Sequence, residues 1–325
     1  MPSILTEEYI NNLSRYGIVV EHETKASIDL NLSDYNSVRM SRTLFEILLR
    51  SVNNSANIEF NIPSFTFGVE FEFVGTAIPS KVVEFDKSMR DRFGMRYYNA
   101  SHYYHNDGYG WILGTDSSIQ YISSAKNSIT GYELSSPKLN YNSKDLEDLA
   151  YVINLVKTVL GGEVNSSCGT HIHIGYSINN LYRSQIETLL AVYSNMESVV
   201  FDPIVPLSRR RNKYCKKTTT FISNKYQKLS ARYCRFTFSR ECKSLHLECR
   251  QLEGTLEYDV ILAWVKLQAY IIYDIISNVD DFEYVSAIMH SNIFDILVRY
   301  PFDTKTIALF ISRVVLFKSK TIQTK

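Results

Sequence analysis

The clearest pattern in the chain is a period of two in the segment SFTFGVEFEFVG, residues 64–75. Alternate residues of a strand point to opposite faces, so large apolar side chains occupy one face and small or acidic ones the other. The apolar face holds Phe65, Phe67, Val69, Phe71 and Phe73, and the other face holds Thr66, Gly68, Glu70 and Glu72. The segments GYELSSP (131–137), HIHIG (171–175) and SLHLECRQL (244–252) predict further strands with one polar face.

Helical periodicity separates these strands. The apolar positions between Ser143 and Gly161 repeat at helical spacing, with Gly161 as the terminator. Similar patterns predict helices at 185–201, 257–277, 281–299 and 303–317. Residues 75–130 show no clear period and are expected to be rich in loops. The first sixty residues predict a helix–strand–helix extension, in which Ser41 caps a short helix.

The fold class follows from how these elements alternate. Strands and helices are interspersed, but the strands carry polar residues at every second position instead of running continuously apolar. Such strands are typical of an antiparallel sheet with one covered and one open face. We therefore expect an α+β fold in which helices cover one face of an antiparallel sheet.

Composition narrows the function without naming it. The chain has 325 residues, 45% of them hydrophobic, as in an ordinary globular protein. Its formal net charge is +1, so the overall charge does not predict binding to nucleic acid or to a membrane. Five cysteines without a CxxC pair predict reduced thiols. The most apolar stretch, residues 260–276, is interrupted by Lys266, Gln268 and Asp274, and the first residues lack the pattern of a signal peptide. We expect a cytoplasmic protein that does not enter a membrane.

The polar faces of the predicted strands carry the candidate chemistry. Glu70 and Glu72 project from the same side of one strand, as do His171 and His173 of another. Adjacent like charges on a sheet repel one another, so several glutamates on one surface call for a cation. Carboxylates bind hard divalent cations such as Mg²⁺, and arginines bind phosphate oxygens in a planar, bidentate manner.

Each motif also has a simpler interpretation when taken alone. An ExE strand is commonly a solvated strand face, and HxH suits zinc or an open polar face. The run RRRNK (209–213) is commonly a solvated basic loop. The case for a site therefore depends on the combination of motifs and on their order.

That order resembles the amidoligase family over roughly residues 65–275. The motifs that carry the resemblance are GVEFEF, then Trp111 and DSS (116–118) ahead of GYELSSP, then CGTHIHIG, RRRNKYC and LECRQLEGT. Members look like relatives of glutamine synthetase and glutamate–cysteine ligase. The resemblance implies an antiparallel sheet of the glutamine synthetase catalytic-domain type. It divides the chain into an N-terminal extension (1–60), a catalytic domain (61–280) and C-terminal helices packed on it (281–325).

The resemblance also implies roles for particular residues. The implied metal ligands are Glu70, Glu72, Glu133, His171 and Glu248. The implied contacts with ATP come from His173, Arg250 and Arg211, and the implied catalytic arginines are Arg250, Arg209 and Arg211. The pattern does not say which of the two histidines binds metal and which binds phosphate. Asp116 is a weaker candidate for contact with the amine or another part of a substrate.

The activity so implied is ligation of a carboxylate to an amine through an acyl-phosphate, dependent on ATP and on Mg²⁺ or Mn²⁺. Each substrate could be a small molecule, a nucleotide or a protein side chain. Related ligases often share active sites between subunits, so an oligomer fits as well. The alternatives are a phosphotransferase on the same fold, a non-catalytic relative, and a zinc hydrolase centred on His171 and His173.

Overall fold

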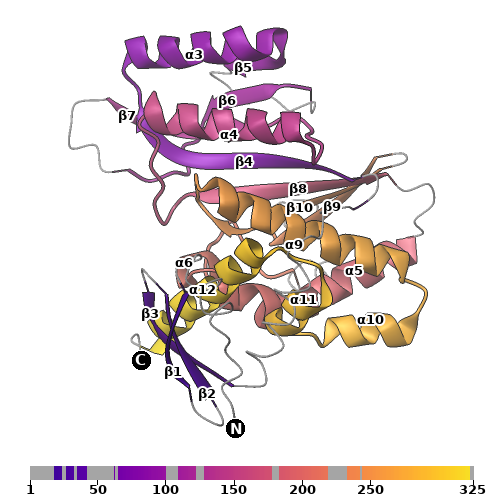
Figure 1. Cartoon of the computed structure of the whole chain (residues 1–325). Helices are drawn as coiled ribbons and strands as arrows, with labels where there is room; N and C mark the ends of the chain where they lie inside the picture. Colours follow the sequence, from indigo (N-terminus) through magenta and orange to yellow (C-terminus); the bar gives the residue numbers. More distant parts are fainter. Residues whose placement is uncertain are drawn as a thin grey trace. The chain divides into compact units, whose positions relative to one another are not determined.

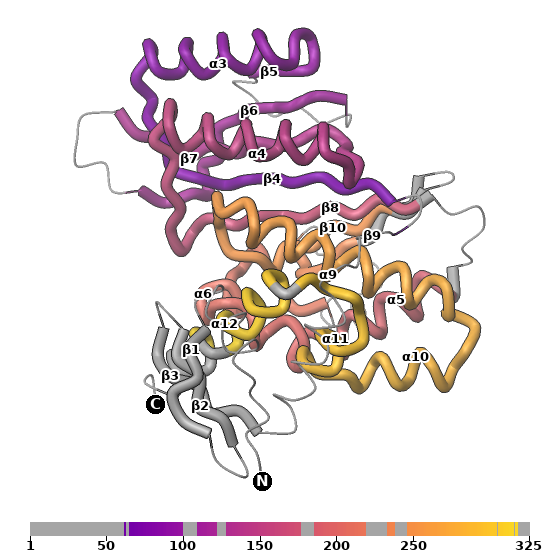
Figure 2. Tube along the Cα trace, viewed as in Figure 1, coloured from indigo at the N-terminus to yellow at the C-terminus, as the bar shows by residue number. Residues whose placement is uncertain are grey.

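A computed structural model of the chain describes residues 18–23, 27–32, 35–41, 62, 65–99, 109–121, 128–177, 183–218, 233–241 and 244–322 (Figures 1 and 2). The chain forms two compact units. One comprises Ile62–Leu190 and Ser208–Ile276; the other comprises Met1–Asn61, Ala191–Leu207 and Ser277–Lys325. The domain boundaries expected from the sequence stay a prediction.

The first unit is built on a seven-stranded sheet with the order β5-β6-β7-β4-β8-β10-β9. Neighbouring strands run antiparallel except for β5 and β6, which pair in parallel. The strands are β4 (Phe65–Thr76), β5 (Tyr97–Asn99), β6 (Trp111–Thr115), β7 (Ile129–Ser135), β8 (Gly169–Ser177), β9 (Phe236–Glu241) and β10 (Ser244–Glu253). The sheet and its helices confirm the α+β class.

The core lies on the apolar face of this sheet, under helices α3 (Pro79–Phe93), α4 (Ser143–Thr158) and α9 (Tyr258–Ser277) (Figure 1). The predicted apolar face of β4 is buried, with Phe73 fully inaccessible. Gln268 of α9 donates to Cys249 Sγ of β10 at 3.3 Å, which fixes α9 against the sheet. By length and composition α9 could cross a membrane, but 61% of its most apolar window is buried inside the protein, as in the core helix of a globular domain.

The expectation that residues 75–130 are rich in loops is wrong for α3, a helix of 15 residues. Pro79 occupies its first turn, Gly94 ends it with a φ of 58°, and Phe85, Met89 and Phe93 are buried at a spacing of four. These are recognisable start, stop and periodicity signals. The charged residues between them lower the overall hydrophobicity, so the apolar stripe is narrow and easily missed.

The other helices predicted beyond residue 60 are present. Asn142, one residue before the predicted Ser143, caps α4 by accepting from the amide of Asp145. The segment 281–299 forms two helices, because Asn292 begins a new one through a capping box with Asp295. The remaining elements include α5 (Arg183–Met196), α10 (Phe282–Met289), α11 (Ile293–Arg299) and α12 (Thr304–Ile322).

In the second unit, the N-terminal segment forms a three-stranded antiparallel sheet. Its strands are β1 (Ile18–Glu23), β2 (Ser27–Leu32) and β3 (Tyr35–Ser41), in the order β1-β2-β3. The helices predicted for this extension, including the one that Ser41 would cap, lie outside the described residues. In the same unit, Arg313 of α12 donates to the carbonyl of Ile204 at 2.9 Å.

Gly131 of β7 allows a turn to pack directly on the polar face of the sheet. A Cβ atom at this position would lie 2.7 Å from the Cβ of Ile119 and 2.8 Å from the carbonyl oxygen of Asp116. The Asp116 amide in turn donates to the carbonyl of Gly131 at 3.0 Å. The glycine therefore decides how closely Asp116 approaches the sheet.

We predict that Gly131→Ala lowers the free energy of unfolding by about 1–3 kcal/mol, because backbone and Cβ atoms must move to relieve the overlap. The matched control is Gly68→Ala on β4, where the nearest atoms would be 3.5 Å away and the added methyl fits. Urea unfolding of both variants measures the difference. Equal stability of the two variants would contradict the close approach at Gly131.

Candidate functional site

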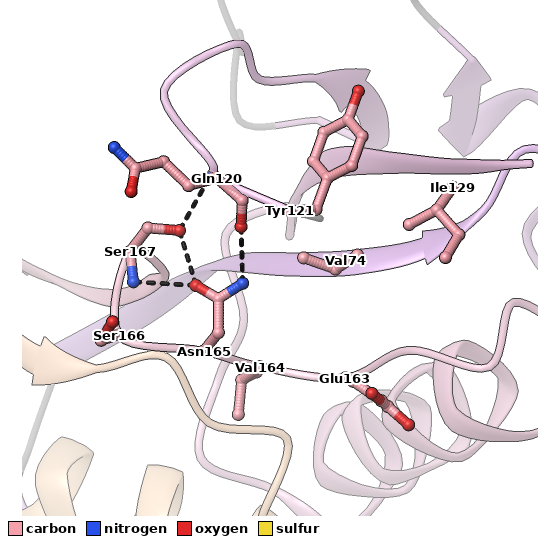
Figure 3. A pocket seen from close by; sticks show the side chains of 9 residues that line it. All are labelled: Val74, Gln120, Tyr121, Ile129, Glu163, Val164, Asn165, Ser166 and Ser167. Carbon is pink, nitrogen blue, oxygen red and sulfur yellow. Dashed lines mark hydrogen bonds between the residues drawn. The ribbon is translucent and has the colours of Figure 1, made fainter. Parts of the chain in front are cut away.

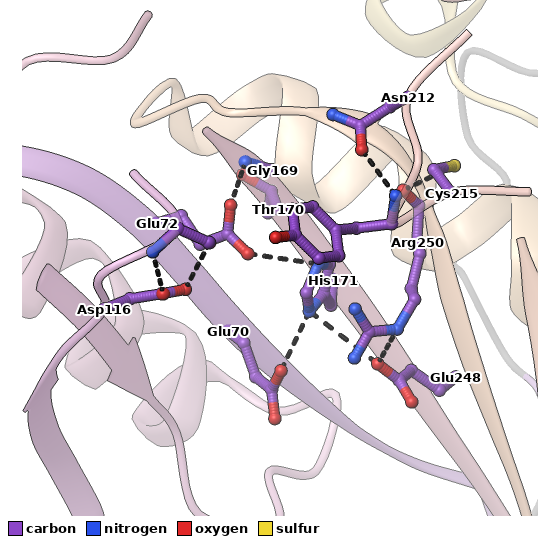
Figure 4. A network of polar contacts seen from close by, with 12 residues as sticks. Glu70, Glu72, Asp116, Gly169, Thr170, His171, Asn212, Cys215, Glu248 and Arg250 are labelled. Carbon is purple, nitrogen blue, oxygen red and sulfur yellow. Dashed lines mark hydrogen bonds and ion pairs between the residues drawn. The ribbon is translucent and has the colours of Figure 1, made fainter. Parts of the chain in front are cut away.

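The polar face of the sheet collects the candidate residues at its centre, on strands β7, β4, β8 and β10. Figure 4 labels Glu70 and Glu72 of β4, His171 of β8, and Glu248 and Arg250 of β10. The strand register sets their neighbours. It places Glu72 opposite Glu133, Glu70 opposite His171, and Glu248 opposite His173. Residues from four strands, separated by up to 178 positions between Glu70 and Glu248, thus form one cluster.

His171 lies at the middle of this cluster and is only 2% exposed. Its Nδ1 is 2.9 Å from Glu70 Oε2 and 3.7 Å from Glu248 Oε1, while its Nε2 is 3.5 Å from Glu72 Oε1. Both ring nitrogens therefore face carboxylates. The ring, on β8, links the glutamates of the two strands that flank it, β4 and β10.

On either side of His171, side chains converge in two groups with the donor types of a metal site. One group is Glu70, His173 and Glu248, and the other is Glu72, Asp116 and Glu133; within each, one ligand atom per residue lies within 4.8 Å of the others. Of the two histidines, the geometry thus favours His173 as a ligand and His171 as the link between the groups. The implied role of His171 on metal stays a prediction.

Asp116 belongs to the second group, although the sequence suggested only a contact with substrate. Its side chain accepts from the amide of Ser118 at 2.7 Å and from the Ser118 hydroxyl at 3.0 Å, which fixes the turn. The backbone amide of Gly169 donates to Glu72 Oε2 at 2.6 Å and orients the neighbouring carboxylate. The DSS motif signals the turn, but only the tertiary fold places it beside Glu72 and Glu133.

Arg250 lies at a β-bulge in β10, where the register with β8 shifts between Cys249 and Leu252. Its Nε is 2.6 Å from Glu248 Oε1, so the guanidinium borders the first acidic group. Its carbonyl accepts from Arg209 Nε at 3.0 Å, from Arg209 Nη2 at 2.6 Å and from Cys215 Sγ at 3.2 Å. A bulge re-aims a side chain within a strand, and here it directs Arg250 toward the cluster.

The other two candidate arginines lie in different surroundings. Arg209 is 3% exposed, and its guanidinium packs over Gly169, where an added Cβ would come within 2.3 Å of Nη2. This favours a role in holding the Arg250 bulge. Arg211 is exposed in the turn that follows, and within the described part of the chain no hydrogen bond or ion pair joins it to the cluster. Contact of either arginine with phosphate stays a prediction.

The electrostatics of the cluster are those of crowded carboxylates. Burial, together with Glu70, Glu72 and Asp116, raises the pKa of Glu133 to about 8. Burial also opposes ionisation of Glu70, but His173 and His171 hold the pKa of that carboxyl well below its ordinary value. Burial disfavours the charged form of His173, yet Glu70 and Glu248 outweigh it and raise its pKa. The first group therefore carries compensating charge from histidine, and the second does not.

His246 is a neighbour that the sequence placed on the polar face without a role. Its Nε2 is 2.8 Å from Nδ1 of His173. The opposite nitrogen of His173, Nε2, lies 3.3 Å from Glu70 Oε1. The alternation of β10 put His246 on the correct face, but no spacing rule links it to a residue 73 positions away.

The residues present fit divalent cations. The group of Glu72, Asp116 and Glu133 offers only oxygen ligands, as Mg²⁺ prefers, and its crowding is what raises the pKa of Glu133. The first group adds one imidazole, a combination that suits Mn²⁺ as well as Mg²⁺. Because these carboxylates are largely buried, a cation would offset a repulsion that solvent does not screen.

A pocket of about 620 Å³ lies farther along the same sheet face (Figure 3). Val74, two positions beyond Glu72, forms part of its floor, and Ile129, Tyr121 and Val164 add exposed apolar surface. Its other lining residues are Gln120, Glu163, Asn165, Ser166 and Ser167. Hydrogen bonds of Asn165 to the Gln120 carbonyl and of the Gln120 amide to Ser167 join the two loops at its edge. Its size is that of a site for a small molecule.

Comparison with known proteins identifies the family. The model of the family described as "putative amidoligase enzyme" matches residues 63–272, and the chain belongs to this family. The family indicates an enzyme, a ligase. No curated protein matches the chain. A solved structure, 3-hydroxy-3-methylglutaryl-coenzyme A reductase from Streptococcus pneumoniae, is 8% identical, with 89% of this chain and 70% of that chain covered and a TM-score of 0.17, too low to support an argument.

We predict that Glu133→Gln stabilises the metal-free protein. The ordinary pKa of 4.5 applies to the unfolded chain and about 8 to the folded one, so between these values the folded protein binds more protons. The free energy of unfolding of the wild type therefore falls as pH rises, by at most about 1.4 kcal/mol per pH unit, and the variant escapes this loss. Thermal unfolding at pH 5 and pH 8 should show the variant's advantage growing with pH.

The matched control is Glu147→Gln, on the exposed side of α4, which should change little at either pH. Addition of Mg²⁺ should reduce the advantage of Glu133→Gln, because a cation relieves the repulsion in the wild type alone. A variant that is less stable than the wild type at pH 8 without metal would contradict the crowding.

Proposed function

We propose that the protein is an ATP- and Mg²⁺-dependent ligase that joins a carboxylate to an amine through an acyl-phosphate. The observation that carries the proposal is the pair of acidic groups on either side of His171, with Arg250 at the border of one. This arrangement has the components that phosphoryl transfer requires: carboxylates for cations and a guanidinium for phosphate oxygens. Membership of the amidoligase family supports the second half of the reaction, amide formation.

In this proposal Glu70, His173 and Glu248 hold one cation, and Glu72, Asp116 and Glu133 hold another. Cations so held supply charge neutralisation at the β- and γ-phosphates of ATP. Mn²⁺ can replace Mg²⁺ most readily in the group that contains His173. We also propose that the sheet is of the glutamine synthetase catalytic-domain type, which its central antiparallel strands and one-sided acidic cluster support.

The reaction has two steps. The substrate carboxylate attacks the γ-phosphorus, the bond to the β-phosphate oxygen breaks, and ADP leaves. Arg250 donates hydrogen bonds to the oxygens of the transferring group, and we expect the exposed Arg211 to add a second guanidinium when substrates bind. The uncharged amine then attacks the acyl carbon, inorganic phosphate departs, and the amine loses a proton as the amide forms.

The pocket beyond Val74 is our candidate site for the organic part of one substrate. It starts two strand residues, about 7 Å, from Glu72 on the same face. Polar and apolar side chains share its lining, and among the described lining residues the one charged side chain is the acidic Glu163, so the pocket suits an uncharged or cationic group better than a phosphate. The nucleotide phosphates would then lie at the opposite, Arg250 side of the cluster.

We predict that ADP and phosphate appear with Mg²⁺ and ATP only when a carboxylate and an amine are both supplied. Glu70→Gln should reduce the rate by about 100-fold or more, because a ligand of the charge-neutralising cation is lost. Glu147→Gln is the matched control and should keep the wild-type rate. Assays with pooled amino acids and amines, followed by coupled detection of ADP, make the measurement.

The same assay separates the alternatives. Turnover of ATP without an amine, with a stable phosphorylated product, would replace the ligase by a phosphotransferase. Zinc-dependent hydrolysis without ATP would favour the hydrolase centred on the two histidines. An absence of ATP binding under every mixture would favour a non-catalytic relative.

We predict that Val164→Asp raises the KM for an uncharged organic substrate by about tenfold, because the substrate would lose an apolar contact and would have to desolvate a carboxylate, at a cost on the order of 1–3 kcal/mol. The affinity for Mg²⁺ should stay unchanged, because Val164 lines the pocket and belongs to neither acidic group. Val83→Asp on α3 is the matched control, as Val83 is 65% exposed. Unchanged KM values for every substrate would remove the pocket from the proposal.

A further inference from the structure

The hydrogen bond between His173 and His246 has a consequence for how the first acidic group binds a cation. His246 of β10 pairs with Gly175 of β8, and His173 lies two residues before that glycine on the same face. The two rings have centroids 5.0 Å apart and planes inclined by 50°, and Nε2 of His246 lies 2.8 Å from Nδ1 of His173. The contact is a diagonal one between neighbouring strands, which long side chains can span.

A hydrogen bond between two ring nitrogens contains one proton, so one nitrogen donates and the other accepts. In a neutral imidazole only one ring nitrogen carries a proton, so the hydrogen bond made by Nδ1 of His173 decides whether its Nε2 is protonated. In His173 the second nitrogen, Nε2, faces Glu70 Oε1 at 3.3 Å and belongs to the group with Glu248. A neutral His173 that donates from Nδ1 has a lone pair at Nε2. This lone pair faces the carboxylate of Glu70, which when ionised is also only an acceptor.

Two facing acceptors repel unless a cation is shared between them. In this tautomer, the lone pairs of Glu70 and His173 can be shared by a divalent ion. In the opposite tautomer His246 would donate to Nδ1, and Nε2–H of His173 would donate to Glu70. That state satisfies the hydrogen bonds but removes the imidazole from the set of ligands.

We propose that His246 is a positioning residue that holds His173 in the tautomer with a proton on Nδ1, so that Nε2 is available to a divalent cation with Glu70 and Glu248. The proposal rests on the cation site of the proposed function, but it adds a residue that touches neither cation nor substrate. His246 then keeps its own proton on Nδ1 and accepts at Nε2. Partners of this kind usually affect metal affinity by about 10–100-fold.

The test compares three full-length proteins: the wild type, His246→Gln and His246→Leu. The glutamine can still accept a hydrogen bond from Nδ1 of His173 through its side-chain oxygen, whereas the leucine cannot. Mn²⁺ affinity is measured by electron paramagnetic resonance of free Mn²⁺. The tautomer of His173 is measured with Mg²⁺ by long-range ¹H–¹⁵N correlation of the imidazole rings, assigned with His173→Gln.

We expect Nδ1 of His173 to be protonated in the wild type and in His246→Gln. In His246→Leu we expect this preference to disappear and Mn²⁺ affinity to fall by about 10–100-fold, with a much smaller loss in His246→Gln. His290→Gln, a change in an exposed histidine that contacts its own helix, is the matched control and should match the wild type. Circular dichroism at the temperature of the assay verifies that each variant is folded.

Two outcomes would overturn the inference, and they differ in what else they affect. If the wild type binds Mn²⁺ and His246→Leu binds it equally, with His173 in the same tautomer, the positioning role is wrong and the ligase proposal is untouched. If the folded wild type binds no Mn²⁺ or Mg²⁺, the cation site is wrong and the proposed function fails with it.

Discussion

The structure depends most on the repulsion among glutamates that converge on one face of a sheet. Glu70, Glu72, Glu133 and Glu248 come from three strands, and all but Glu133 contact a buried imidazole, where water screens their charges poorly. A fold that needed only stability would replace them with smaller or uncharged residues. Retaining them costs stability, visible in the raised pKa of Glu133, and gives a surface complementary to cations.

The backbone around the cluster is adapted to hold it. Gly131 lets the Asp116 turn reach the sheet, the Gly169 amide orients Glu72, and the bulge at Arg250 re-aims a guanidinium. Arg209 holds the carbonyl of that bulge from a buried position. These features share a physical reason: side chains on a regular strand point straight up from the sheet, so convergence requires local departures from regularity.

The two acidic groups differ in chemistry and in surroundings. One contains an imidazole and borders Arg250; the other contains only carboxylates and lies toward a pocket of mixed polar and apolar lining. In the proposed ligase this polarity assigns the phosphates to one side and the organic substrate to the other. Histidine compensates charge only in the first group, so the all-carboxylate group has the stronger need for a bound cation.

The sequence by itself determined the strands, their faces and most of the cluster. Period-two alternation fixes which side chains share a face, and that sufficed for Glu70, Glu72 and the pair of histidines. It also determined the family, because the motifs keep their order. The pattern did not reveal α3, because only one residue in four of this helix is apolar and buried and the residues between are mostly charged or polar.

Only the tertiary structure decided which residues meet. The register of β4 with β7 and β8 depends on pairing between segments far apart in the chain, and no local pattern encodes it. Strand pairing and the path of the connecting loops also bring Asp116 beside Glu133 and place His246 against His173, and they leave Arg209 buried but Arg211 exposed, although both belong to one run of arginines. Residues that look alike in the sequence thus acquire different surroundings, because strand pairing and burial depend on contacts between segments far apart in the chain.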